Sequence, residues 1–276
     1  MSRKLFLSFV LLLAAYPALY AAQEVPSERL VERPAITPAM VSERPEKGQW
    51  TVTSFYERSN VVQSSRHGHW DELTNSILYR KGDIAGYVSI SKLQRFSERD
   101  YTANMGAYFK LGEYLLHEEF GWGWDVDFIY KLQNIVEVSH KLKNNLYWQF
   151  GYNYRAYIVN DTHLMYPGLM YYFGDNYIGV DYGLSVINSR GLAQYGVIKS
   201  DFAINKFLHW SLGAAIGERL YDIFGIDASK EYGYIIFTGA NLNVTKDLNF
   251  RIGYSYGSEN PKFIKRSLNL ALSLKF

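Results

Sequence analysis

The stretch Leu268-Asn269-Leu270-Ala271-Leu272-Ser273-Leu274-Lys275-Phe276 alternates between apolar and polar or small side chains without a break. Successive side chains of a strand point to opposite faces, so the four leucines and the final phenylalanine share one face. In a soluble protein these leucines would pack on a core. In a transmembrane barrel they would face lipid, and the other set would face a lumen. The remainder of the chain has to decide between these two arrangements.

The amino end has the layout of an export signal. Two basic residues, Arg3 and Lys4, precede an almost wholly apolar run over 5–15. This run is short for a helix that spans a membrane, which needs about 20 residues. We therefore expect a cleaved signal peptide, with the cut after Ala21 or Ala22.

Three segments divide the chain. Residues 1–22 are the expected signal peptide. Residues 23–47 contain four prolines and show no lasting periodicity, which predicts an extended leader in the periplasm. From residue 48 to residue 276 the chain reads as strand, turn and strand, which predicts one β-barrel domain.

The composition excludes several classes of protein. The chain has no cysteine, so disulfides, thiolate metal sites and a lipid-modified signal-peptide cysteine are ruled out. A net charge of +2 does not favour a nucleic-acid partner. Aromatic residues make up 17% of the chain, and Trp and Tyr favour the boundary between membrane and water.

Alternation recurs through the second half of the chain, in the segments 146–155, 178–186, 208–217 and 248–257. The faces opposite the apolar sets are rich in Gly, Ser and Asn. A soluble sandwich would carry many Lys and Glu there instead. Each apolar set is long enough to cross a thin membrane at a tilt, which takes about 9 to 11 residues. These segments favour a transmembrane barrel.

We predict an all-β, antiparallel transmembrane barrel of about fourteen strands, with about twelve as the alternative if the region 114–140 is partly loop. Tight turns, such as 174–176, alternate with longer links, such as 60–69 and 222–231. If Phe276 lies at the periplasmic side, the tight turns are periplasmic and the long links face outward. The expected strands are 49–59, 69–79, 85–96, 100–110, 113–122, 131–141, 146–158, 164–173, 177–188, 193–204, 207–219, 232–244, 248–257 and 263–276.

Charged residues at the polar phase of these strands are the candidate functional residues. A basic side chain in lipid at the midplane would cost about 2 to 4 kcal/mol, so a position in the lumen is favoured. The expected lumen-facing residues are Arg155, Asp181, Lys199, Asp201, Arg219, Arg251 and Lys265. They could form a charged ring that sets solute selectivity, or a network of ion pairs that fills the interior.

The histidines show no catalytic or metal-binding constellation. His67 and His69 are expected in the first outward loop, where an exposed polar loop is favoured over a metal or acid–base site. His140 follows Ser139 directly, and neighbours in a strand point to opposite faces. The stretch His117-Glu118-Glu119 lacks the second histidine of a helical zinc motif. We expect no enzyme activity, no metal and no cofactor.

Three stretches carry a resemblance to a known family. They are Gln94-Arg95-Phe96 followed by Asp100-Tyr101, then Gly217-Glu218-Arg219-Leu220-Tyr221, and the closing Leu-x-Leu-x-Phe strand. Their order resembles the YaiO-type family of outer-membrane β-barrels, which implies the fold and the location but hardly any activity. The ending also resembles bacterial outer-membrane proteins in general, whose final strand is read by the insertion machinery. In this chain that implies an insertion signal made by Leu268, Leu270, Leu272, Leu274 and Phe276.

The favoured function is a pore or export component in the outer membrane for small or extended solutes. One alternative is a structural or adhesive barrel whose outer loops, above all 222–231, bind a partner. A less favoured alternative is an outer-membrane hydrolase. The expected partners are outer-membrane lipid and the barrel-insertion machinery, and the oligomeric state stays open.

Overall fold

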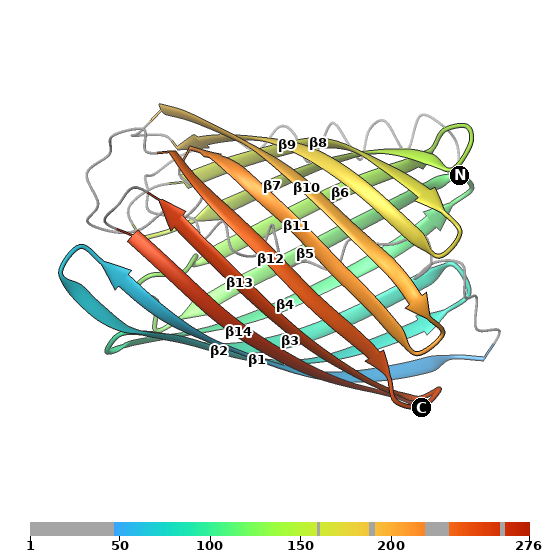
Figure 1. Cartoon of the computed structure of the whole chain (residues 1–276), viewed down its shortest axis with the longest axis horizontal. Coiled ribbons are helices and arrows are strands. Elements are labelled where there is room, and N and C mark those ends of the chain that lie inside the picture. The colour runs from blue at the N-terminus through green and yellow to red at the C-terminus, as the bar shows by residue number, and fades with distance from the viewer. Residues whose placement is uncertain (1–46, 159–160, 188–190, 219–231, 260–262) are drawn as a thin grey trace.

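The fold was analysed in a computed structural model, which describes residues 47–158, 161–187, 191–218, 232–259 and 263–276. These residues form one closed antiparallel barrel of 14 strands (Figure 1). No helix among them is long and apolar enough to span a membrane. The strands are β1 (Gln49–Gln63), β2 (Arg66–Lys81), β3 (Ile84–Arg95), β4 (Glu98–Leu111), β5 (Tyr114–Trp124), β6 (Leu132–Lys141), β7 (Leu146–Ala156), β8 (Asp161–Phe173), β9 (Asn176–Ile187), β10 (Gly191–Asn205), β11 (Leu208–Glu218), β12 (Tyr232–Asn243), β13 (Leu248–Glu259) and β14 (Phe263–Lys275).

The strand count confirms the prediction of fourteen over twelve. The doubtful region 114–140 forms two regular strands, β5 and β6, which pair from Tyr114 with His140 to Trp122 with Leu132. Their alternation is hard to see in the sequence because the inward phase carries His117 and Glu119 beside glycines. The expected signal peptide and nearly all of the expected leader lie outside the described residues.

The first link between strands is much shorter than predicted. β1 and β2 pair up to Gln63 and Arg66, so only Ser64 and Ser65 form the turn. His67 lies in β2 opposite Val62, and the prediction of an outward loop over 60–69 is therefore wrong. The polar residues suggested a loop, but strand pairing continues through them because a hairpin needs no apolar face once it leaves a membrane.

The barrel closes between β1 and β14. Trp50 and Phe276 exchange two backbone hydrogen bonds, of 2.9 and 3.0 Å. We call the end that holds these two residues the near end, and the opposite end the far end. Tight turns at the near end begin at Gly82, Gly112 and Gly174, each with φ between 60° and 67°. This left-handed conformation suits glycine, and it lets two residues reverse the chain.

The outer surface carries the large apolar side chains. On β14 the apolar set is exposed and the alternate residues Lys265, Ser267 and Asn269 are buried. The exposed or partly exposed residues are Leu268, Leu270, Leu272, Leu274 and Phe276. Aromatic rings gather at both ends of this surface. Trp50 packs on Tyr79 at the near end, with ring centroids 4.7 Å apart, and Tyr101 stacks on Trp124 at the far end.

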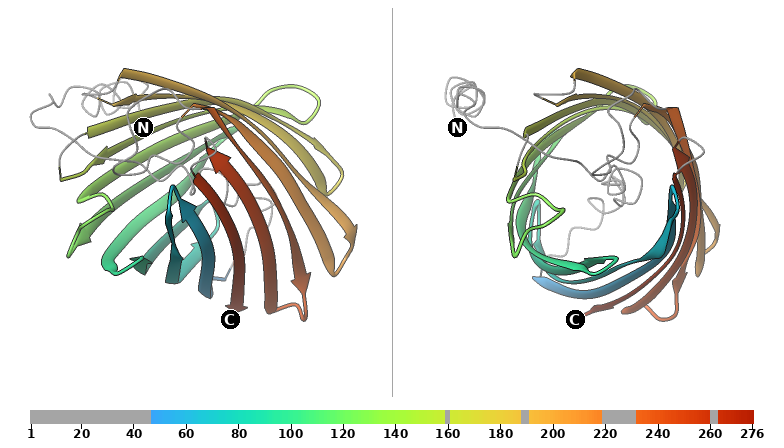
Figure 2. Two further views of the ribbon diagram at one scale, coloured as in Figure 1. Left: turned by 60° about the vertical axis from the view of Figure 1, so that its left-hand side comes forward. Right: turned by 90° about the vertical axis from the view of Figure 1, so that its left-hand side faces the viewer.

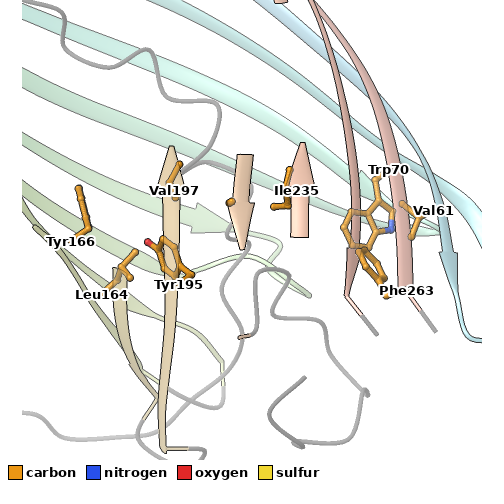
Figure 3. Close-up of a cluster of buried hydrophobic side chains, with 9 residues drawn as sticks. Val61, Trp70, Leu164, Tyr166, Tyr195, Val197, Ile235 and Phe263 are labelled. Carbon is orange, nitrogen blue, oxygen red and sulfur yellow. The ribbon is translucent and has the colours of Figure 1, made fainter. Parts of the chain in front are cut away.

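The interior is lined by the alternate side chains of all the strands, and Figure 2 shows the ring that the strands make around it. A cluster of buried apolar and aromatic side chains extends from the middle of the interior toward the far end, as Figure 3 shows. Trp70 and Phe263 lie beside Val61 at one side of the cluster, with ring centroids 5.8 Å apart. The other members are Val61, Leu164, Tyr166, Tyr195, Val197, Ala215 and Ile235.

Candidate functional site

The near half of the interior encloses a cavity of about 390 Å³. The cavity reaches the near end, because Gly82 and Asp83 of the β2–β3 turn are among its lining residues. Hydroxyl side chains of β1 and β2 line one side, namely Thr51, Thr53, Thr74 and Ser76. Aromatic and charged side chains of β3 to β10 line the other, including Tyr87, His117, Glu119, Glu137, Asp181 and Lys199.

A chain of hydrogen bonds runs across four strands of the charged wall. His117 Nδ1 lies 2.5 Å from the Glu137 carboxylate, and His117 Nε2 lies 3.0 Å from the Tyr87 hydroxyl. Tyr166 donates a hydrogen bond of 2.6 Å to the other oxygen of Glu137. The ring of Tyr108 stacks on His117, with centroids 4.3 Å apart. Because an ionised carboxylate only accepts hydrogen bonds, His117 donates to Glu137 through Nδ1.

A second set of polar contacts links this wall to Arg155. The single hydroxyl hydrogen of Tyr87 is donated to Glu119, which accepts a further hydrogen bond of 2.7 Å from the Gln133 amide. The same amide group accepts at its oxygen from Arg155 Nε, at 2.8 Å. Arg155 is only 2% exposed. Of the expected lumen residues, Arg155 therefore lies in a packed hydrogen-bonding position rather than in open solvent.

Asp181 and Lys199 form an ion pair beside the cavity. The Lys199 ammonium lies 2.6 Å from the Asp181 carboxylate, and the two side chains are 16% and 10% exposed. Gln149 donates a further hydrogen bond to Asp181. The register explains the meeting, since Asp181 of β9 is paired with Val197 of β10, two residues from Lys199. Both expected lumen residues line the cavity.

The remaining expected residues differ in their surroundings. Asp201 lies 3.0 Å from His209 Nδ1 on the neighbouring strand. Arg251 is partly buried in β13 and makes no ion pair with any residue that the structure describes. Lys265 is buried and lies 2.8 Å from Glu57, and Ser59 donates to the same carboxylate oxygen. Arg219 lies outside the described ranges.

A short loop between β5 and β6, residues 125–131, folds into the far half of the interior. Asp100 is completely buried and accepts three backbone N–H groups from this loop, at 2.7 to 2.9 Å. Ile129 and Tyr130 are buried as well, and Tyr130 donates 2.7 Å to Asn104. Gly123 makes room for the fold, because a Cβ there would lie 2.4 Å from the Tyr130 carbonyl oxygen. We call 125–131 the inward loop.

Arginine and aromatic side chains hold the inward loop from the β2–β3 side. The Arg95 guanidinium lies 4.2 Å from the Trp70 ring centroid and 4.8 Å from that of Phe128. Phe96 adopts φ 54°, which is strained for a bulky residue, and its ring packs edge-on against Trp70. A Cβ on Gly68 would lie 2.3 Å from the Phe96 ring, so this arrangement needs glycine at residue 68.

Sequence reasoning did not find the hydrogen-bonded wall or the loop anchor. Tyr87, Glu137 and Gln133 show no motif, and His117 was considered only as part of a helical zinc pattern. Alternation along each strand predicts which of these side chains point inward. Which of them contact each other can be deduced only when the stagger between neighbouring strands is known. Within the described ranges, no group of three or more His, Asp or Glu residues could hold a metal ion.

Comparison with known proteins supports the fold and leaves the family open. No family profile matches the chain, and no curated protein sequence matches it. A bacterial polysaccharide outer membrane secretin is similar with a TM-score of 0.59 and 7% identity, over 85% of this chain and 100% of that chain. The outer membrane protein Omp33 of Acinetobacter baumannii is similar with a TM-score of 0.50 and 12% identity, over 83% and 99% of the two chains. The translocator domain of the autotransporter NalP from Neisseria meningitidis gives a TM-score of 0.46 and 13% identity, over 86% and 93%. The chain therefore has the fold of an outer-membrane β-barrel.

Proposed function

We propose that this chain forms a passive pore in the outer membrane that conducts small hydrophilic solutes and prefers cations. The near end faces the periplasm and the far end faces the outside. This orientation rests on the links at the near end, which are all four residues or shorter, whereas the far end also carries the seven-residue inward loop. Short links are typical of the periplasmic side of such barrels. The export signal over 1–22 is part of the same proposal.

The observation that carries the proposal is the polar cavity at the near end. Its lining contains four carboxyl groups, of Asp83, Glu119, Glu137 and Asp181, against the basic side chains of Arg80 and Lys199 and the imidazole of His117. An excess of negative charge in a narrow passage raises the local concentration of cations. Hydroxyl groups on the opposite wall can replace part of a solute's hydration shell.

The inward loop favours small solutes over extended ones. It occupies the far half of the interior with Ile129 and Tyr130, and Asp100 fixes it through three backbone hydrogen bonds. A passage that must admit a polymer would need this loop to leave. The contacts around Asp100 oppose this movement, because the loop would have to give up all three hydrogen bonds to leave.

Membership of the YaiO-type family remains part of this proposal, as does the absence of catalysis. The resemblance rests on residues that have defined positions in the barrel. Arg95 and Asp100 both contact the inward loop, and Tyr101 stacks on Trp124. These contacts give a structural reason for that combination of residues, namely the placement of the loop in the interior.

The first test measures conductance of purified, refolded protein in a planar lipid bilayer. We expect discrete current steps and, under a salt gradient, a reversal potential that indicates cation preference. Steps with no preference would remove the selectivity part of the proposal. A bilayer that stays closed at all voltages would overturn the passive pore and favour a structural or adhesive barrel.

The second test changes the charge of the interior at Arg251, which has no ion pair among the described residues. We expect Arg251→Glu to increase the cation preference while the barrel stays folded. Arg58→Glu on the outer surface is the matched control, because Arg58 is 53% exposed there and should leave the reversal potential unchanged. Equal effects of both variants would contradict a selectivity role for the interior.

A further inference from the structure

One carboxylate lies in the middle of the outer, lipid-facing surface. On β5 the outward phase begins with Tyr114 and runs through Glu118 to Trp122. Both aromatic residues are exposed, at 47% and 39%. Trp124 at the far end lies on the same face, so Glu118 lies between the aromatic rings of the two ends, four positions from Tyr114 and four from Trp122. At about 3.4 Å per residue, this is about 14 Å along the strand from either ring.

The surroundings of Glu118 offer it no polar partner. Its cross-strand neighbours are Ala107 on β4 and Val136 on β6. Ala107 is in turn paired with Gly86 on β3. Within the described residues, the Glu118 carboxyl makes no hydrogen bond or ion pair. The row Gly86–Ala107–Glu118 is therefore a shallow strip of small side chains that ends in a carboxyl group.

An isolated carboxyl group is costly in hydrocarbon, and such groups are rare on surfaces that face lipid alone. The neutral, protonated form costs least, and it carries one O–H donor and one C=O acceptor. Two such groups can therefore satisfy each other completely. Small neighbouring residues help, because they allow two membrane surfaces to approach closely.

We infer that the surface around Glu118 is the contact between two copies of this chain, in which Glu118 meets Glu118 of the partner subunit. Two copies inserted in the same direction are related by a twofold axis along the membrane normal. Residues of equal number then lie at equal depth, so the two carboxyl groups meet without any further adjustment. A different protein would have to supply a matching polar group at this depth, whereas a second copy always does.

The first experiment measures the mass of the particle in nanodiscs or mild detergent for three variants. We expect the unchanged protein to be a dimer. Glu118→Gln should stay dimeric, because two amides also pair donor to acceptor. Glu118→Leu should weaken association about tenfold, equivalent to about 1.4 kcal/mol, and stay folded as judged by heat-dependent gel mobility.

A second experiment fills the strip instead of removing the carboxyl. A Cβ on Gly86 would have its nearest neighbour at 3.8 Å, so Gly86→Leu is accommodated by the barrel and projects outward over the strip. We expect it to weaken association as Glu118→Leu does. Gly196→Leu is the matched control, because Gly196 has no atom within 4 Å of an added Cβ and lies on β10.

A third experiment uses the absence of cysteine in the chain. Ala107→Cys introduces a single thiol beside Glu118, and a short bis-maleimide should join two copies in native membranes. Adding Glu118→Leu should abolish the cross-link, and Leu212→Cys on β11 should not give it. A monomer at every protein-to-lipid ratio would overturn the inference. Cross-linking of Ala107→Cys that is unchanged when Glu118→Leu is added would overturn it as well.

Discussion

The two halves of the barrel interior are built from the same alternating strands, yet one is packed and the other holds a cavity. In the far half, Trp70 and Phe263 pack together, and Ile129 and Tyr130 of the inward loop form a second buried cluster with Leu93 and Tyr157. In the near half, the Asp181–Lys199 pair borders a cavity of about 390 Å³. Strand number sets the diameter of a barrel, but the size of the inward side chains decides how much of it stays empty.

The two halves also differ in how much an ion pair contributes to the free energy of unfolding. In the far half the Lys265 and Glu57 side chains are only 3% and 8% exposed, so water screens the attraction between them only weakly. In the near half Asp181 and Lys199 have some contact with the cavity and a third partner in Gln149. The expected effects below decrease from the packed half to the cavity and then to the outer surface.

The largest effect is expected from Lys265→Met. It removes the ammonium group that lies 2.8 Å from the buried Glu57 carboxylate, which should cost about 3 to 5 kcal/mol in free energy of unfolding. Urea unfolding in phospholipid vesicles measures this. The double variant with Glu57→Gln is the control and should recover a large part of the loss, because no uncompensated charge remains. Equal stability of Lys265→Met and the unchanged protein would show that water reaches the Glu57 carboxylate despite its low exposure.

A somewhat smaller, local effect is expected from Asp100→Ala. The three loop N–H groups lose their acceptor, which should destabilise the inward position of the loop by about 2 to 3 kcal/mol. Hydrogen exchange at Asp127, Phe128 and Ile129 should become about a hundredfold faster, and single-channel conductance should rise. Asp127→Ala is the control, because that side chain is exposed and only its backbone bonds to Asp100. A loop that exchanges as slowly as before would show that apolar packing alone holds it.

In the cavity half, Lys199→Met should cost only about 1 to 2 kcal/mol, because Asp181 keeps Gln149 and contact with the cavity. The loss of one basic group from the lining should also increase the cation preference. Unfolding and reversal-potential measurements on one preparation report both. A stability loss as large as that of Lys265→Met would erase the distinction between the two halves.

The smallest effect is expected on the outer surface near the far end, where Arg58 and Asp71 lie 3.9 Å apart and are 53% and 27% exposed. Arg58→Ala should change the free energy of unfolding by less than about 1 kcal/mol, because exposed pairs contribute little. The same urea titration provides the comparison. A larger loss would mean that the Tyr56–Asp71 hydrogen bond, at 2.7 Å, depends on Arg58 for its geometry.

The sequence predicted what depends on a single strand. The inward phase of Lys265 and the outward phase of Leu268 follow from alternation, and fourteen strands follow from repeating it. It could not predict that Lys265 meets Glu57, because the two residues are 208 positions apart and their contact depends on closure of the barrel. The Asp100 anchor was missed for a different reason. Its partners are backbone N–H groups, which leave no pattern in the side chains.

The seam at Trp50 and Phe276 also has a consequence for the order of assembly. Every other pairing in the barrel joins strands that follow one another in the sequence, so it closes a much smaller loop of chain. The seam alone brings together segments more than 200 residues apart, as the 208-residue separation of Ser59 and Ser267 shows. Its entropic cost is the largest of any pairing and nothing local offsets it. The pairs of consecutive strands can therefore form in any order, whereas the barrel closes only after the first and last strands are held side by side.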